Sequence, residues 1–175
     1  MIVWIEKPLV LLLHDRQLAE HGGLAGVRDE HLLASALARP QQLYAYGDPP
    51  PDLADLAASL AYGIAKNHAF VDGNKRTAFV AYRTFLALNH ARLEASADEK
   101  YAMILGLANG EFSESEFADW LRAHLHFDAP HQLQEKPARY RAPKKLVKKT
   151  AKKKAPRDTK AGSANKTKEN PTRRR

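Results

Sequence analysis

Residues 67–77 read Asn-His-Ala-Phe-Val-Asp-Gly-Asn-Lys-Arg-Thr and are followed directly by an apolar pattern of helical period. The stretch therefore predicts a loop that runs into the N-terminus of a helix. The first backbone N–H groups of a helix have no partner within it, and the helix dipole favours negative charge at that end. Because Lys75 and Arg76 add two cations at the same place, we expect this helix to bind a phosphate group.

Each residue of this stretch has a chemical role and a structural alternative. His68 stands beside the expected phosphate, where it would act as the general base for an attacking hydroxyl, or it is a surface histidine. Asp72 offers the single carboxylate that Mg²⁺ uses together with phosphate oxygens, or it caps the helix. Gly73 lets the backbone approach a phosphate, or it is an ordinary turn glycine. Asn74 braces the loop, touches the nucleotide or caps the helix.

The cations of this region are expected to clamp the phosphate. Lys75 and Arg76 would neutralise the charge that spreads over a transferring group, and their alternative is a solvated face. Lys66, just before the loop, would add further positive charge. Phe70 is expected to be a buried anchor, and the other seven of the eight histidines are assigned no chemical role.

The segments before this stretch predict two helices and a flap. Pro8 and an apolar face of Leu9, Leu12, Leu13 and Leu18 predict a helix that ends at Gly22-Gly23. A short helix is expected to begin at Asp29 and to end at Pro40. Residues 41–51, which include three successive prolines, then predict an extended, exposed flap. Residues 41–48 of this flap would pair with a segment of a target protein as an additional strand, or they form a plain surface loop.

The rest of the body reads as helices. Asp52 is expected to begin a helix with an inner stripe that includes Leu56 and Ile64, and a longer helix is expected from about residue 74 to residue 89. Ser96 and Ser113, each followed three residues later by glutamate, predict capping boxes that open two more helices. The sequence therefore predicts an all-α bundle with a short extended segment at residues 1–5 and a small flap.

The signature itself resembles that of a known family. The pattern His68-x-Phe70-x-Asp72-Gly73-Asn74-Lys75-Arg76 is similar to the motif of the Fic/Doc (Fido) family, and lysine at position 75 resembles its Doc (death-on-curing) branch. Most Fic proteins carry glycine at that position and a further arginine three residues after Arg76, where this chain has Phe79. A second stretch supports the Doc branch: His14-Asp15, then Gly22–Asp29 with its Gly-Gly-x-x-Gly-x-Arg-Asp pattern, then Leu32-Leu33 and residues 35–40. The resemblance covers roughly residues 1–126.

This resemblance implies a compact Fic/Doc-type helical bundle and a specific activity. Doc-like proteins transfer the γ-phosphate of ATP, with Mg²⁺, to a threonine of elongation factor Tu and so arrest translation. They act as toxins whose antitoxin docks over the active site. The catalytic residues would be His68, Asp72, Lys75 and Arg76; the nucleotide would bind Gly73, Asn74, Lys75, Arg76 and Lys66; and Asp72 would hold Mg²⁺.

Two other functions stay open at this point. The first is a Fic-type adenylyltransferase, which moves AMP from ATP to a target hydroxyl. The second is a non-catalytic binding protein that kept the fold, against which the intact His68 and Asp72 argue. No Ser/Thr-x-x-x-Glu inhibitory motif is found, which favours control by a separate partner.

Composition divides the chain in two. Residues 136–175 hold 17 lysines and arginines against 2 acidic residues, a net charge of +15, whereas residues 1–135 carry −7. We therefore expect a domain at residues 1–128 and a disordered Lys/Arg-rich tail at residues 129–175, which either contacts nucleic acid or the ribosome nonspecifically or serves only as a solubilising extension. The chain has no cysteine, which excludes disulfides and thiolate metal sites. Because neither a leader nor an apolar run of bilayer length is found, we expect a cytoplasmic protein without membrane contact.

Overall fold

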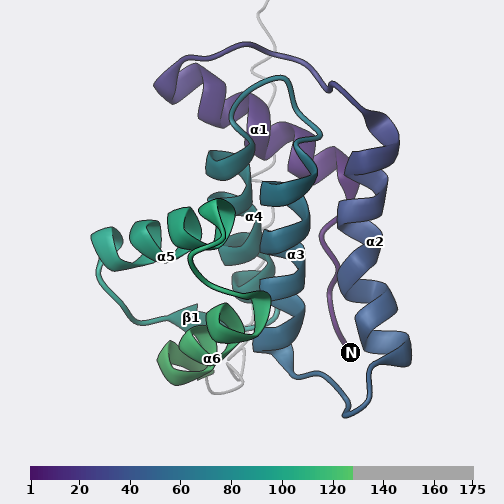
Figure 1. The fold of residues 1–175 in the computed structure, drawn as a ribbon, viewed down its shortest axis with the longest axis vertical. Helices are drawn as coiled ribbons and strands as arrows, with labels where there is room; N and C mark the ends of the chain where they lie inside the picture. Colours follow the sequence, from purple (N-terminus) through teal and green to yellow (C-terminus); the bar gives the residue numbers. More distant parts are fainter. Residues whose placement is uncertain (128–175) are drawn as a thin grey trace, which may run out of the picture. The chain divides into compact units, whose positions relative to one another are not determined.

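The computed structural model describes residues 1–127, and this part of the chain is almost entirely helical (Figure 1). The all-α prediction is confirmed. The elements, in chain order, are α1 (Lys7–His21), α2 (Glu30–Tyr46), α3 (Leu53–Asn67), α4 (Asn74–Leu88), β1 (Ala91–Leu93), α5 (Ala97–Asn109), α6 (Glu114–His124) and β2 (Leu125–Phe127).

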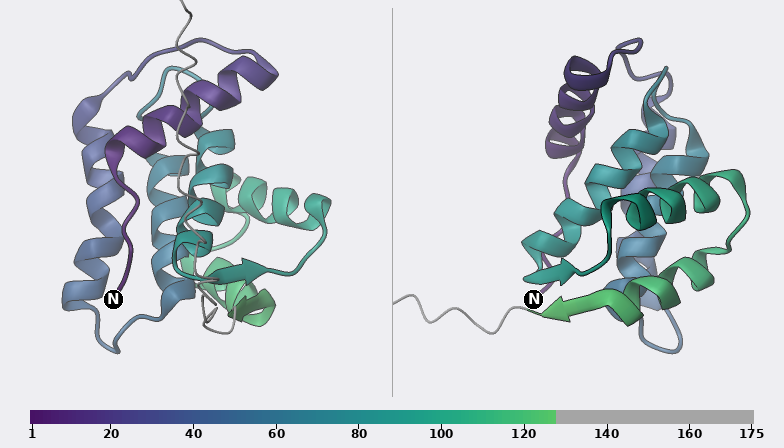
Figure 2. Two further views of the ribbon diagram at one scale, coloured as in Figure 1. Left: turned by 180° about the vertical axis from the view of Figure 1, so that it is seen from behind. Right: turned by 90° about the vertical axis from the view of Figure 1, so that its left-hand side faces the viewer.

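Helix α3 is the centre of the core. It packs against α2, α4, α5 and α6, and most of its residues are buried because small and apolar side chains follow one another along it. Asp52 opens it with a complete capping box, in which Asp52 and Asp55 each accept a backbone N–H of the other. Figures 1 and 2 show α3 and α4 side by side, with α1 crossing their upper ends. The loop between α3 and α4 is therefore held by two core helices.

Helix α2 overturns the prediction that Pro40 ends the helix and that a flap follows. The helix continues through Pro40 to Tyr46, so residues 41–46 are helical and only residues 47–51 remain as a connecting loop. Pro40 removes one backbone N–H from the helix. Tertiary contacts offset that loss: Leu43 packs on the core, and the ring of Tyr44 meets Trp4 edge-on at 5.6 Å between centroids.

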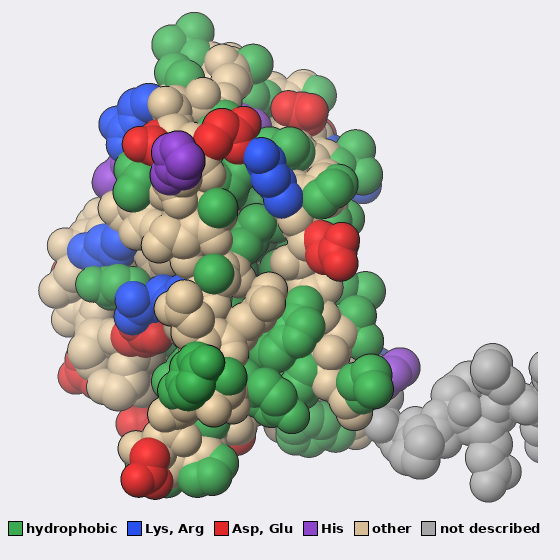
Figure 3. Space-filling view, turned by 90° about the vertical axis from the view of Figure 1, so that its right-hand side faces the viewer, with side chains coloured by type: hydrophobic (Ala, Val, Ile, Leu, Met, Phe, Trp, Pro, Cys, Tyr) green, Lys and Arg blue, Asp and Glu red, His purple; other side chains and the backbone are tan. Residues whose placement is uncertain are grey.

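A helix at residues 41–46 uses its own backbone groups, so a target segment cannot pair there as an added strand. Figure 3 shows the side of the molecule on which α2 lies, and apolar side chains are concentrated at the lower end of this view. The exposed large apolar residues of α2 are Tyr44 and Tyr46.

The N-terminal segment is extended, as predicted, and a side chain fixes it. Asn89, just after α4, accepts the N–H of Val3 and donates to the carbonyl of Val3 at 2.8 and 2.9 Å. Asn89 thus replaces the neighbouring strand that an extended segment would otherwise need.

The short strands β1 and β2 were not predicted. They pair antiparallel with Ala91 opposite Phe127 and Leu93 opposite Leu125, and the right-hand view of Figure 2 shows them next to each other. Leu125, the C-cap residue of α6, is the first residue of β2.

The predicted Lys/Arg-rich tail at residues 129–175 lies outside the described residues. Each helix between residues 1 and 127 is too short or too polar to span a bilayer.

Candidate active site

The signature loop joins α3 to α4 through two residues in the left-handed region. His68 ends α3 with φ 50° and ψ 44°, and Gly73 precedes α4 with φ 71°. A positive φ is uncommon for a residue with a side chain, so the loop holds His68 in a conformation that the surrounding structure must impose. The side chain of His68 is exposed, immediately beyond the end of a core helix.

Asn74 braces this loop. Its side-chain oxygen accepts the N–H of Phe70 and its amide nitrogen donates to the carbonyl of Phe70, both at 2.9 Å. Phe70 is 1% exposed, so the predicted anchor role is confirmed. Of the three roles considered for Asn74, its contacts bear out loop bracing. The capping role is wrong, because Gly73 occupies the cap position and Asn74 is the first residue of α4.

The second motif, Gly22–Asp29, lies directly against the loop. The N–H groups of Arg28 and Asp29 both donate to the carbonyl of Ala69, at 2.7 and 3.1 Å, and the N–H of Val71 donates to the carbonyl of Gly26 at 3.0 Å. These bonds explain why the two motifs belong together although about forty residues separate them in the sequence.

The glycine-rich turn after α1 also holds the two charged groups of the site. The carboxylate of Asp72 accepts the N–H of Gly73 and, at 3.3 Å, the N–H of Leu24, while Arg76 donates to the carbonyl of Gly22 at 2.8 Å. Arg76 also lies 3.7 Å from Asp72. The N–H groups of Gly73 and Leu24, with the nearby Arg76, lower the pKa of the Asp72 carboxyl, so this group is ionised at neutral pH.

These residues surround one pocket of about 370 Å³. It is lined by His68, Val71, Asp72, Gly73, Asn74, Lys75, Arg76, Tyr101 and Leu105. The structure therefore brings together every predicted site residue except Lys66. Lys66 lines a neighbouring pocket with Arg39 and Tyr62, and its Nζ lies 3.4 Å from where a Cβ of Gly110 would be.

Helix α5 contributes residues that the sequence did not indicate. Tyr101 and Leu105 form part of the pocket wall, and Asn109 accepts a hydrogen bond from the Lys75 ammonium at 2.8 Å. Their spacing of four residues, on a helix opened by Ser96, is the one signal that could have placed Tyr101 and Leu105 on a common face.

Arg83 does not take the place of the arginine that most Fic proteins carry at the position of Phe79. The guanidinium of Arg83 lies over the ring of Phe79 at 4.9 Å. It is seven residues from Arg76, about 10 Å along a helix axis, and it lines a different pocket.

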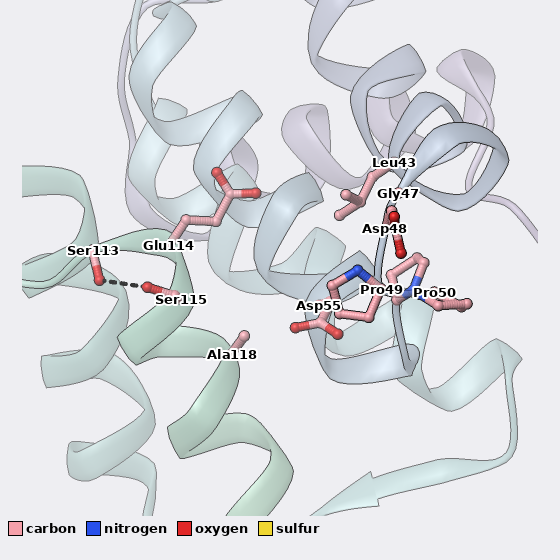
Figure 4. A pocket seen from close by; sticks show the side chains of 11 residues that line it. Leu43, Gly47, Asp48, Pro49, Pro50, Asp55, Ser113, Glu114, Ser115 and Ala118 are labelled. Atoms are coloured by element: carbon pink, nitrogen blue, oxygen red, sulfur yellow. Dashed lines mark hydrogen bonds between the residues drawn. The ribbon is translucent and has the colours of Figure 1, made fainter.

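A larger pocket of about 520 Å³ lies between residues 47–51 and the start of α6 (Figure 4). Three of its polar side chains have partners within the protein. Asp55 binds Arg122, Glu114 binds Arg39, and the hydroxyl of Ser113 bonds to Ser115 and Glu116. No lysine or arginine lines this larger pocket, whereas Lys75 and Arg76 line the smaller one, so the smaller pocket is the one suited to an anion.

The donor set of the smaller pocket suits Mg²⁺ bound together with a phosphate. Within residues 1–127, no three acidic or histidine side chains gather as a metal cluster. Mg²⁺ commonly uses one or two carboxylates plus substrate phosphates and waters, and Asp72 offers one ionised, half-exposed carboxylate beside the N-terminus of α4.

Comparisons with known proteins agree with the geometry. Residues 4–86 match the model of the Fic/DOC family. The chain is 34% identical over 113 residues to a protein of Escherichia phage P1 named "Protein kinase doc", an alignment that covers 65% of this chain and 88% of the phage protein. It is 51% identical over 77 residues to "Toxin Doc" of Mycolicibacterium smegmatis, covering 44% of this chain and 59% of that relative's length.

Proposed function

Because this chain belongs to the Fic/Doc family, we propose that it is a Doc-like toxin that transfers the γ-phosphate of ATP to a serine or threonine hydroxyl of a translation factor. Elongation factor Tu is the expected target, and arrest of translation is the expected consequence. The observation that carries the proposal is the convergence of His68, Asp72, Lys75 and Arg76 on one open pocket at the N-terminus of α4.

The N-terminus of α4 supplies the phosphate-binding part of this function. Its first N–H groups have no partners within the helix, and Gly73 adopts the left-handed φ of 71° that the turn before them requires. Arg76, fixed by Gly22 and Asp72, adds a guanidinium that matches phosphate geometry. Electrostatic stabilisation of the transferring group is the main contribution that a protein makes to phosphoryl transfer.

His68 supplies the proton transfer. The imidazole takes the proton of the target hydroxyl as the hydroxyl oxygen attacks the γ-phosphorus, the bond to the β-phosphate oxygen breaks, and ADP leaves. Asp72 would hold Mg²⁺, which neutralises charge on the phosphate oxygens when it is bound. The exposed position of His68 leaves room for the target chain to approach.

The alternative of adenylyl transfer has one observation in its favour. The Lys75 ammonium is bonded to Asn109 on α5, so in this arrangement its charge is directed at the end of α5. The phosphate site would then remain open for the α-phosphate of ATP, and AMP would be transferred with release of pyrophosphate.

Labelling distinguishes the two reactions. The purified protein is incubated with Mg²⁺, a bacterial lysate and ATP labelled at either the α- or the γ-phosphate. A His68→Ala variant removes the base, and a His31→Ala variant removes another exposed histidine at the start of α2. We expect label from the γ position alone, lost with His68→Ala and kept with His31→Ala. Label from the α position would establish the adenylyltransferase, and no label in any sample would contradict both.

Control by a separate antitoxin belongs to the same proposal. An antitoxin segment that covers the pocket of His68 and Arg76 would exclude ATP. We expect growth arrest on expression of this chain and relief by a cognate antitoxin expressed from the same host. Growth arrest that persists in the His68→Ala variant would separate toxicity from the transferase site.

A further inference from the structure

His14, on α1, is buried beneath the signature loop. His14 is 1% exposed to solvent. Its ring stacks on the ring of Phe70, with the centroids 3.9 Å apart and the planes inclined by 16°. Its Nδ1 lies 3.0 Å from the hydroxyl oxygen of Thr77, in the first turn of α4. The ring therefore contacts the loop on one side and the phosphate-binding helix on the other.

The same ring packs against Gly73. A Cβ built on Gly73 would lie 3.4 Å from Cε1 of His14, at van der Waals contact distance. Asp72 lies between Phe70 and Gly73 in the loop, and Thr77 lies in the first turn of α4. One side chain from α1 thus contacts three points of the segment that carries the site.

The other ring nitrogen identifies the tautomer. Nε2 of His14 is buried and has no hydrogen-bond partner among the described residues. A proton on Nε2 would be a buried donor without an acceptor, which is costlier than an unprotonated ring nitrogen in the same place. Burial lowers the pKa of His14 and so favours its neutral form, although Asp15 and Asp72 oppose this effect and Arg76 adds to it.

We propose that His14, as the neutral tautomer with its proton on Nδ1, is a positioning residue that donates to Thr77 and fixes Phe70 against the first turn of α4. His68 and Asp72 lie on the segment that this contact orients, so their geometry relative to a bound phosphate depends on it. The kinetic part of this inference rests on the proposed transferase function, whereas the tautomer and the order of the loop do not.

Two conservative pairs of variants test the contact. His14→Phe keeps a ring to stack on Phe70 and loses the donor, whereas His14→Asn keeps a donor close to the position of Nδ1 and loses the ring. Thr77→Val removes the acceptor at nearly constant shape, and Thr77→Ser restores it. His21→Phe is the matched control, since His21 is an exposed histidine on the same helix.

The expected kinetic result is a loss of kcat with little change in KM for ATP. We expect His14→Phe and Thr77→Val to lower kcat roughly ten- to hundredfold, because small displacements of reacting groups have effects of that order. Thr77→Ser and His21→Phe should stay within about twofold of the unaltered chain, and His14→Asn should lie between, since it keeps the donor. Equal kcat in His14→Phe and His21→Phe would overturn the inference.

Nuclear magnetic resonance gives the readout that does not depend on activity. The ¹⁵N shifts of the His14 ring report which nitrogen carries the proton, and hydrogen exchange of the Val71 and Arg28 amides reports whether the loop stays bonded to the Gly22–Asp29 stretch. We expect a protonated Nδ1 and faster exchange in Thr77→Val. A protonated Nε2, or unchanged exchange in Thr77→Val, would contradict the positioning role. These results hold even if no phosphoryl transfer is found.

Discussion

Gly23 shows how much of the site depends on a residue without a functional group. Its φ is 132°, and a Cβ at this position would lie 2.6 Å from an oxygen of Asp72, 2.8 Å from Leu18 and 3.1 Å from Arg76. Asp72 and Arg76 can only be held by the turn after α1 because Gly23 gives them room. The neighbouring Gly22 has φ 73° and nothing within 4 Å of such a Cβ.

The two glycines form a matched pair for a test at the residue scale. Both substitutions by alanine impose a positive φ on a residue with a side chain, which costs on the order of 1–3 kcal/mol in each case. Only Gly23→Ala should displace Asp72 and Arg76. We expect Gly23→Ala to lower kcat/KM about tenfold or more relative to Gly22→Ala, at a comparable melting temperature. Equal activities would show that Asp72 needs no support from this turn.

Tyr82, in contrast to Gly23, has a functional group, and this group is buried in the core. Its ring is fully buried against Phe79 and Phe117, but its hydroxyl has no hydrogen-bond partner in the described part of the chain. Burial raises the pKa of this phenol far above its ordinary value.

Removing that hydroxyl should stabilise the protein. We expect Tyr82→Phe to raise the free energy of unfolding by about 1 kcal/mol, because an unpaired buried hydroxyl has lost its water without compensation. Thermal unfolding measures the change, and the exposed Tyr46 provides a control in Tyr46→Phe, which should be neutral. A lower melting temperature for Tyr82→Phe would mean that its hydroxyl has a partner in solution.

The residues of the signature could be predicted from sequence because they act within a few positions of one another. His68, Asp72, Gly73, Lys75 and Arg76 lie together on one loop and one helical turn, so short-range spacing was enough to place them in one pocket. The sequence assigned His14 to the family resemblance but placed neither His14 nor Tyr101 at the site, because these residues reach it from α1 and α5 through tertiary packing. The apolar pattern of α1 pointed to Leu12 as an inward residue, but Leu12 is exposed and the buried residues of α1 are Val10 and His14.

The ends of the helices also show that sequence predicts only those features that neighbouring residues decide. The starts of α3, α5 and α6 were predicted correctly, because the capping side chains act on an N–H only three residues away. The end of α2 was predicted wrongly, since contacts of Leu43 and Tyr44 with distant residues decide it. Strands of three residues, such as β1 and β2, give no periodic signal that a sequence could reveal.

The approach of α2 to α3 depends on Gly63. A Cβ on Gly63 would lie 3.1 to 3.3 Å from the Cα, carbonyl oxygen and Cβ of Ala36, which is the residue whose carbonyl Pro40 leaves without its helical donor. Backbone atoms cannot turn aside as a flexible side chain can. The two helices must therefore move apart if Gly63 gains a side chain.

We expect Gly63→Ala to destabilise the chain although alanine favours helices more than glycine by about 1 kcal/mol. The strain of overpacking is typically about 1–3 kcal/mol and should exceed that gain. The measurement is the free energy of unfolding in urea, with Ala34→Gly on the exposed face of α2 as a reference for propensity alone. A stabilised Gly63→Ala would show that α2 shifts at little cost, and Pro40 would then be the more important determinant of its path.

At the scale of the whole molecule, charge separates the two parts of the chain. Residues 1–135 carry a net charge of −7 and residues 136–175 carry +15. In the described part, the buried apolar residues all lie between Ile5 and Leu121. We therefore propose that residues 1–128 fold without residues 129–175, and that the basic segment binds nucleic acid nonspecifically.

Truncation after residue 128 tests both parts of this proposal. We expect the shortened chain to keep its melting temperature within about 2 °C, since it retains the whole described core.

The full chain should bind an arbitrary DNA or RNA duplex at low salt. The logarithm of its affinity should fall linearly with the logarithm of the salt concentration, because lysines and arginines that bind phosphates release counterions from the nucleic acid. A variant with Lys152, Lys153 and Lys154 changed to glutamine should show a shallower slope. Equal binding by the full and shortened chains would assign any nucleic-acid contact to the acidic body, which its charge makes the less favourable surface.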